Sequence, residues 1–354
     1  MGGMIPVFDG HNDTLLRLLL DPSRPFATRT DAGHIDAVRA AEGGLAGGLF
    51  AMFTPPDATP FDRFAPPSDE ARDDAPPAGP VPPAGPIDPS GALRATLAMV
   101  ARLRRLEAEG ALRVCTSADE VEVARRDGVL AAVPHLEGAE AIVDLGVLES
   151  LHALGLRSLG PVWSRPNAFA TGVPFAFPGG PDVGPGLTAH GRELVHACDR
   201  LRIVLDVSHL NEAGFWDLLD ASERPVVASH SNAHALCASP RNLTDAQLDA
   251  LAERDGLVGL NFAVAFLRED GGRSADTPVE TMVRHLDHLV DRMGEDRVGL
   301  GSDFDGTTVP GAIGDASGLP VLLDALAAHG WDEATIRRVA YGNWLSLLRR
   351  VQEA

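Results

Sequence analysis

The sequence predicts an α/β protein that folds as a single (β/α)8 barrel of the TIM type, and two observations support this prediction. First, eight short segments rich in Val, Leu, Ile, Phe and small apolar residues recur along the chain, mostly separated by stretches of helical periodicity. Second, these segments are continuously apolar, as are strands of a parallel sheet that helices cover. Such a barrel takes about 250 residues plus insertions, and the chain has 354.

The eight predicted strands occupy residues 5–13, 43–54, 128–138, 156–163, 201–210, 224–232, 256–264 and 296–306. Residues 188–201 place apolar residues three and four apart, which predicts an amphipathic helix. Another helix is predicted to begin at Thr244 and Asp245, which suit an N-cap, and to end at Gly256. An open, doubly wound sheet is the alternative. No GxGxxG motif follows the first strand, so the dinucleotide-binding form of that fold has no support.

Residues 55–90 interrupt this pattern, because Pro and acidic residues dominate there and apolar periodicity is absent. A helix or a strand could not tolerate so many prolines. We therefore predict a loop insertion after the second strand, within one domain that spans residues 1–354. Barrel loops at that edge border the active site, so a lid or an oligomer contact is conceivable, but a mobile surface loop is the simpler interpretation.

The composition excludes several classes of function. The chain carries 30 basic and 50 acidic residues, a net charge of -20, so a large surface for nucleic acid is not expected. All the basic residues are Arg, which excludes a Schiff-base lysine, a P-loop lysine and a carboxylated lysine between two metals. Cys115, Cys198 and Cys237 are too few and too far apart for a disulfide framework. Without a signal peptide or an apolar run of about 18 residues, we expect a soluble, cytoplasmic protein with no membrane partner.

Polar side chains end five of the predicted strands, where each apolar run stops. They are His11 and Asp13, Glu137, His209, His230, and Asp303. Because the carboxyl ends of barrel strands meet at one mouth, we expect these side chains to converge. Imidazole and carboxylate together are ligands for divalent ions such as zinc. Burying all of them without a metal would carry a desolvation penalty at every group. The sequence therefore predicts a metal site.

The spacing also suggests how the predicted ligands divide between two metal ions. His11 and Asp13 are two residues apart, so on an extended strand they face the same side and can chelate one ion. His209 and His230, from adjacent strands, can hold a second ion, and Glu137 is the sensible bridge in a chain without Lys. His135 lies deeper than Glu137 on the same strand, so we expect a residue of the barrel interior there.

The chain resembles the membrane dipeptidase (renal dipeptidase) family of the amidohydrolase superfamily through FDGHNDTLLRL, HLEGAEAI, LDVSHLN, SHSNAHALCASPRNLTDAQLDAL, GLVGLNF and VGLGSDFDG. The similarity runs from Val7 to about Asn343, apart from the insertion. It implies two metal ions, with zinc expected, held by His11, Asp13, the bridging Glu137, His209 and His230. It further implies that Arg241 holds the substrate's terminal carboxylate, that Asp303 contacts the substrate amine and shuttles a proton, and that the protein is a homodimer.

One position departs from the family. Where the family often has a His that polarises the scissile carbonyl, the segment GPVWSRPNAF places Trp163, whose indole N–H donates but does not titrate. Three explanations stay open: the metals polarise the carbonyl alone, Arg165 or Asn167 substitutes, or the substrate differs from the usual dipeptides.

The leading hypothesis is hydrolysis of dipeptides, including those with a D-residue at the C-terminal position, by a hydroxide that bridges two metal ions. Asp303 would be the general acid–base, and Trp163 and Asn167 would contact substrate with Arg241. One alternative keeps the site but changes the substrate to an N-acyl amino acid or a β-lactam, which also carry a carboxylate. Another alternative is a barrel that binds metals without catalysis.

Overall fold

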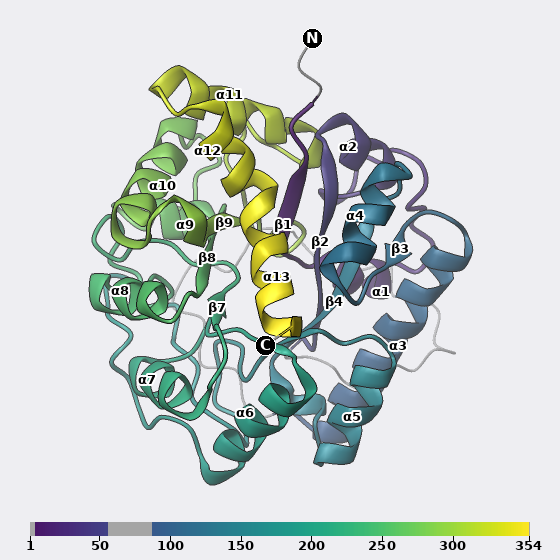
Figure 1. Ribbon diagram of the computed structural model, residues 1–354, viewed down its shortest axis with the longest axis vertical. Helices are drawn as coiled ribbons and strands as arrows, with labels where there is room; N and C mark the ends of the chain where they lie inside the picture. The colour runs from purple at the N-terminus through teal and green to yellow at the C-terminus, as the bar shows by residue number, and fades with distance from the viewer. Residues whose placement is uncertain (1–3, 56–86, 354) are drawn as a thin grey trace.

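The computed structural model describes residues 4–55 and 87–353. Eight parallel strands form a nearly closed barrel in the order β6-β5-β4-β2-β1-β9-β8-β7, surrounded by helices (Figure 1). A parallel bridge between Asp206 and Val227 joins the two ends of this order. The predicted (β/α)8 barrel is thus confirmed.

Each predicted strand segment contains one of the barrel strands. The strands are β1 (Val7–Asn12), β2 (Leu45–Phe53), β3 (Arg113–Val114), β4 (Ala131–Glu137), β5 (Ser158–Gly160), β6 (Val204–Leu205), β7 (Val227–Ala228), β8 (Leu257–Asn261) and β9 (Val298–Gly301). The additional strand, β3, pairs with β4 outside the barrel order. Its two residues are too few to show a periodicity, so the sequence did not predict it.

The helices of the described residues are α1 (Thr14–Leu20), α2 (Ala37–Glu42), α3 (Pro89–Ala108), α4 (Ala118–Arg126), α5 (Leu145–Ala153), α6 (Ala189–Leu201), α7 (Glu212–Ala221), α8 (Asp245–Glu253), α9 (Val264–Leu267), α10 (Val279–Met293), α11 (Leu319–His329), α12 (Glu333–Arg337) and α13 (Asn343–Glu353). The two predicted helices are α6, capped by Thr188, and α8, where Thr244 and Gln247 form a capping box. None of these helices is long and apolar enough to cross a membrane.

The end of the predicted insertion needs a correction. We predicted a loop over 55–90, but α3 already begins at Pro89. The Asp88 side chain accepts a hydrogen bond from Gly91 N, and Pro89 lies in the first turn, where a missing N–H costs nothing. Prolines therefore exclude a helix interior but not a helix start. The rest of the predicted insertion, 56–86, lies outside the described residues.

Helix α13 closes one end of the barrel, and it crosses in front of the strands in Figure 1. Its Trp344 is fully buried and packs in one cluster with Phe8, Val204 and Leu257, which lie at or near the starts of β1, β6 and β8. The Trp344 indole also donates a hydrogen bond of 2.9 Å to the carbonyl of Leu300. The amino-terminal end of the barrel is therefore filled, and the carboxyl end is left for a site.

We expect Trp344→Ala to lower the free energy of unfolding by about 3–5 kcal/mol, because it removes a buried aromatic side chain and leaves a cavity. Equilibrium urea denaturation measures this change. Trp216→Ala is the matched control, because Trp216 is 40% exposed on α7 and should cost about 1 kcal/mol or less. Equal losses for the two variants would contradict the assigned role of Trp344.

Candidate active site

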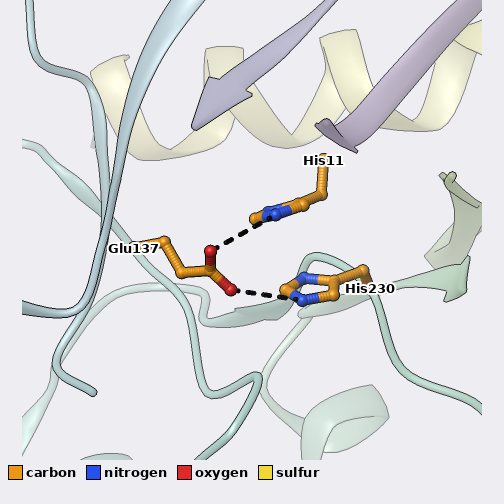
Figure 2. A group of neighbouring side chains, drawn as sticks. All are labelled: His11, Glu137 and His230. Carbon is orange, nitrogen blue, oxygen red and sulfur yellow. Dashed lines mark ion pairs between the residues drawn. The ribbon is translucent and has the colours of Figure 1, made fainter. Parts of the chain in front are cut away.

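The carboxyl ends of the strands bring the predicted metal ligands together around Glu137, the last residue of β4. Its Oε1 atom lies 2.9 Å from His209 Nε2 and 3.6 Å from His230 Nε2, and its Oε2 atom lies 3.7 Å from His11 Nε2. Figure 2 shows the carboxylate between the rings of His11 and His230, with one oxygen directed at each. Glu137 therefore lies between the imidazoles of His11, His209 and His230.

A second group of ligand atoms lies beside the first. His11, Asp13 and Asp303 each offer one atom within 4.8 Å of the others. We expected His11 and Asp13 to meet along an extended strand, but β1 ends at Asn12, and Asp13 has φ -99° and ψ 23° as the N-cap of α1. The turn into α1, not the strand, brings Asp13 Oδ2 to 3.8 Å from His11 Nε2.

Two of the site residues adopt a left-handed backbone. His209 has φ 70° and Asp303 has φ 57°, which is uncommon for residues other than glycine. Backbone hydrogen bonds hold both: Val173 N donates to His209 O at 2.8 Å, and Asp303 N donates to His11 O at 3.0 Å. Such conformations concentrate at functional sites, where surrounding contacts fix them.

Burial keeps His209 and His230 neutral. It pushes the pKa of both rings well below the usual value, and the positive charges of Arg241 and His11 act in the same direction. A neutral imidazole has a lone pair and is the form that binds a metal. Electrostatics therefore favours the ligand form of both residues.

The carboxylates make the same site favourable for a cation. Burial alone would lower the pKa of His11, but Glu137 and Asp13 raise it to about 10. Burial in turn raises the pKa of Glu137 to about 8 and that of Asp303 to about 6. The carboxylates thus stabilise positive charge at this site, whether a proton or a metal cation carries it.

Several buried polar atoms at the site have no hydrogen-bond partner in the part of the chain that the structure describes, which fits a metal centre. Both ring nitrogens of His11 and the Oδ1 atom of Asp13 are buried and have no hydrogen-bond partner among the described residues. The Nε2 atoms of His209 and His230 lie 3.1 Å apart. Buried polar atoms without partners are costly, and divalent ions would satisfy these nitrogen and oxygen donors.

A cavity of about 150 Å³ opens beside these side chains. Its polar wall contains Glu137, His209 and Asp303, and its remaining wall is largely aromatic. The lining residues are Asp13, Leu16, Phe53, Glu137, Trp163, Phe175, His209, Phe266, Asp303, Gly306 and Thr307. The cavity is therefore large enough for a small molecule beside the candidate ligands.

Trp163 and Asn167 are the two substrate-binding candidates in the loop after β5, and they have different surroundings. The Trp163 ring lines the cavity, with its centroid 5.8 Å from that of His209. Asn167 does not line the cavity: its Nδ2 donates to Pro161 O at 2.8 Å, and its Oδ1 accepts from Phe169 N at 2.8 Å. Its amide connects backbone groups of the loop to one another.

Arg165 and Arg241 are both buried but differ in their partners. Arg165 donates from Nε to Glu140 Oε1 at 2.7 Å, so its charge is balanced within the chain. Arg241 has no carboxylate within ion-pair distance among the described residues: it donates to His230 O at 3.0 Å, and its Nε has no partner. It packs against Phe266, which lines the cavity. A buried, unbalanced guanidinium beside a cavity is suited to an anion.

The sequence reasoning missed several buried groups behind the site. Asn261, at the end of β8, donates to Asp303 Oδ2 at 2.9 Å. Asp206 lies behind His230, and Asp9 accepts hydrogen bonds from Ser302 that tie β1 to β9. An acidic residue inside an apolar run was the available signal, because burying a charge requires such partners.

Comparisons with known proteins agree with this geometry. The model of the family described as membrane dipeptidase (peptidase family M19) matches residues 3–354. The chain belongs to this family. The protein is therefore a metallo-dipeptidase, which is a type of hydrolase. The family resemblance seen in the sequence is confirmed.

Three relatives show how close this similarity is. A metallo peptidase from Rhodobacter sphaeroides, solved with a phosphinate mimic of the dipeptide L-Ala-D-Ala, is 50% identical with a TM-score of 0.90, and the match covers 99% of this chain and 100% of that one. The structure of a metallo peptidase named dipeptidase AC is also 50% identical, with a TM-score of 0.91 and the same coverage. An uncharacterized protein in the pqqA 5' region of Klebsiella pneumoniae is 50% identical over 255 residues, 71% of this chain and 94% of the relative.

Proposed function

We propose that this metallo-dipeptidase holds two divalent metal ions, with zinc expected, and hydrolyses dipeptides, including those with a D-residue at the C-terminal position. His11, Asp13, Glu137, His209 and His230 would hold the ions. The observation that carries the proposal is the Glu137 carboxylate, whose two oxygens face three imidazoles from other strands. The L-Ala-D-Ala mimic bound to the Rhodobacter relative supports the stereochemistry.

The metals and the side chains would divide the chemistry. Two such ions, when bound, supply a nucleophilic water near neutral pH and polarise the scissile carbonyl. Asp303 lines the cavity, and because Asn261 donates to its Oδ2 atom, the Oδ1 atom is the one that would face the reactants. Asp303 would accept the proton of the attacking water at this oxygen and deliver it to the leaving amine.

Arg241 would bind the terminal carboxylate of the substrate, which explains why a buried guanidinium has no internal carboxylate partner. The Trp163 ring would form part of the wall that contacts the substrate. Of the explanations for the absent family His, substitution by Arg165 or Asn167 is the less supported, because Glu140 and the loop backbone already engage them.

The test of this function is metal content per chain on protein purified without chelator, together with hydrolysis of matched L,L and L,D dipeptides. We expect two equivalents of metal and turnover. Two equivalents without dipeptide hydrolysis, but with hydrolysis of an N-acyl amino acid or a β-lactam, would favour the alternative substrates. Metal without any turnover would favour the non-catalytic barrel. The homodimer and the cytoplasmic location remain predictions.

We expect Arg241→Lys to reduce kcat/KM for dipeptides by roughly 10–100-fold, because a lysine keeps the charge but loses the two-pronged hydrogen bonds to a carboxylate, each worth about 1.5–3 kcal/mol. Steady-state kinetics on a dipeptide and on its C-terminal amide measure this. The amide is the control, because it lacks the carboxylate and should lose little in the variant. Equal losses on both substrates would remove Arg241 from carboxylate binding.

A further inference from the structure

The ring nitrogens of His230 face two different environments. Its Nε2 atom is directed at Glu137 Oε1, and its Nδ1 atom lies 2.8 Å from the Ser229 hydroxyl. A neutral imidazole carries one proton, on either nitrogen. If Nε2 is to bind a metal through its lone pair, the proton has to be on Nδ1. The direction of the Ser229 hydrogen bond therefore decides whether His230 can be a ligand.

Asp206, just after β6, sets that direction. Its Oδ1 atom accepts from the backbone N–H groups of Ser208 and Ser229, both at 2.9 Å. Its Oδ2 atom contacts the Ser229 hydroxyl in a short hydrogen bond. An ionised carboxylate only accepts, so Ser229 has to spend its single hydroxyl proton on Asp206. The hydroxyl oxygen can then only accept from His230, whose proton must be on Nδ1.

We propose that Asp206 is a positioning residue that acts through the Ser229 hydroxyl to hold His230 in the tautomer with an unprotonated Nε2. All three residues are buried, so water does not compete for these hydrogen bonds. This inference rests on the proposed function, in which His230 is a metal ligand.

The neighbouring ligand His209 has no such constraint. Its Nδ1 atom lies 2.7 Å from the Ser164 hydroxyl, which has no other side-chain hydrogen-bond partner within the described residues. Either Ser164 or His209 can therefore be the donor. The two histidines thus differ on the Nδ1 side of the ring: a carboxylate fixes the direction of the serine hydrogen bond for His230 but not for His209.

Asp206→Asn should reverse the hydrogen bonds without changing the size of the side chain. The two backbone N–H groups require an oxygen at the Oδ1 position, so the amide NH2 has to face Ser229. The hydroxyl then accepts from this amide and donates to His230 Nδ1, which moves the ring proton to Nε2. The equivalent exchange behind the catalytic histidine of serine proteases gives the wrong tautomer and lowers kcat about 10⁴-fold.

The direct test is the tautomer of His230, read from 15N NMR shifts of full-length protein labelled with 15N-histidine and freed of metal. We expect a proton on Nδ1 in the wild type and on Nε2 in Asp206→Asn. Zinc affinity, from competition with a chromophoric chelator, should fall at least 10–100-fold for one of the two ions in Asp206→Asn. The zinc affinity of Ser229→Ala should fall less than that of Asp206→Asn, because without the hydroxyl the His230 ring can take either tautomer.

Two comparisons keep the test decisive. Ser302→Ala is the matched control, because Ser302 donates to the buried Asp9 at 2.8 Å as Ser229 does to Asp206, but it has no hydrogen bond to a ring nitrogen of any described residue. It should leave the His230 tautomer unchanged. An Nε2 proton in the wild type, or Asp206→Asn binding zinc as tightly as Ser229→Ala or more tightly, would overturn the inference. Wild-type protein that binds no metal but shows the Nδ1 proton would instead overturn the proposed function.

Discussion

Glu137→Gln is expected to abolish dipeptide hydrolysis and to remove bound metal. The wild-type carboxylate presents one oxygen to His209 and His230 and the other to His11. A glutamine has one oxygen and one NH2 group, so it directs N–H donors at one side of the site and lacks the negative charge that would hold the two proposed cations. Bound metals would stabilise the transition state by several kcal/mol, so their loss corresponds to a fall in kcat of at least about 10³-fold. Elemental analysis and steady-state kinetics measure both effects.

Glu140→Gln is the control for this variant. Glu140 lies on the same segment and is also buried, but it pairs with Arg165 instead of facing the imidazoles. Breaking a buried ion pair should destabilise the fold by about 3–5 kcal/mol while the metal content stays unchanged. If Glu137→Gln kept two metal equivalents and full turnover, Glu137 would not be the bridging ligand.

The barrel and the convergence of the site were predictable because both depend on local patterns. Continuous apolar runs gave all eight barrel strands, and the position of Glu137 and His230 at the ends of such runs placed them at one mouth. The backbone of Asp13 was not predictable in this way. Whether a residue after a strand stays extended depends on where the next helix begins, and α1 begins immediately after Asp13.

The groups behind the site depend on partners that are distant in the sequence. Asp206 acquires its role from Ser229, and Asn261 from Asp303, through contacts across different strands. Asn167 shows the opposite case, because its position in the loop suggested a substrate contact, whereas local backbone groups use its amide. A single sequence shows which residues are polar, but only the fold shows which of their hydrogen bonds are already made.

Asp303→Asn is expected to lower kcat by about 10²–10⁴-fold while two metal equivalents remain bound, because it removes the proposed general acid–base but no proposed ligand. The amide is close in size to the carboxylate and can still accept the hydrogen bond from Asn261, so the loop should keep its shape. KM should change little. Single-turnover kinetics and metal analysis on the same preparation separate the two effects.

Asp305→Asn tests whether this loss belongs to position 303 or to the whole loop. Asp305 also has a left-handed backbone, but its carboxylate accepts from Thr14 Oγ1 at 2.9 Å and from His34 N at 2.7 Å, and it does not line the cavity. We expect the variant to be less stable, with kcat reduced far less than in Asp303→Asn. A lost metal equivalent in Asp303→Asn would make Asp303 a ligand, since its carboxylate lies near the ring of His11 and the carboxylate of Asp13. Retained turnover would instead assign the proton transfer to another group.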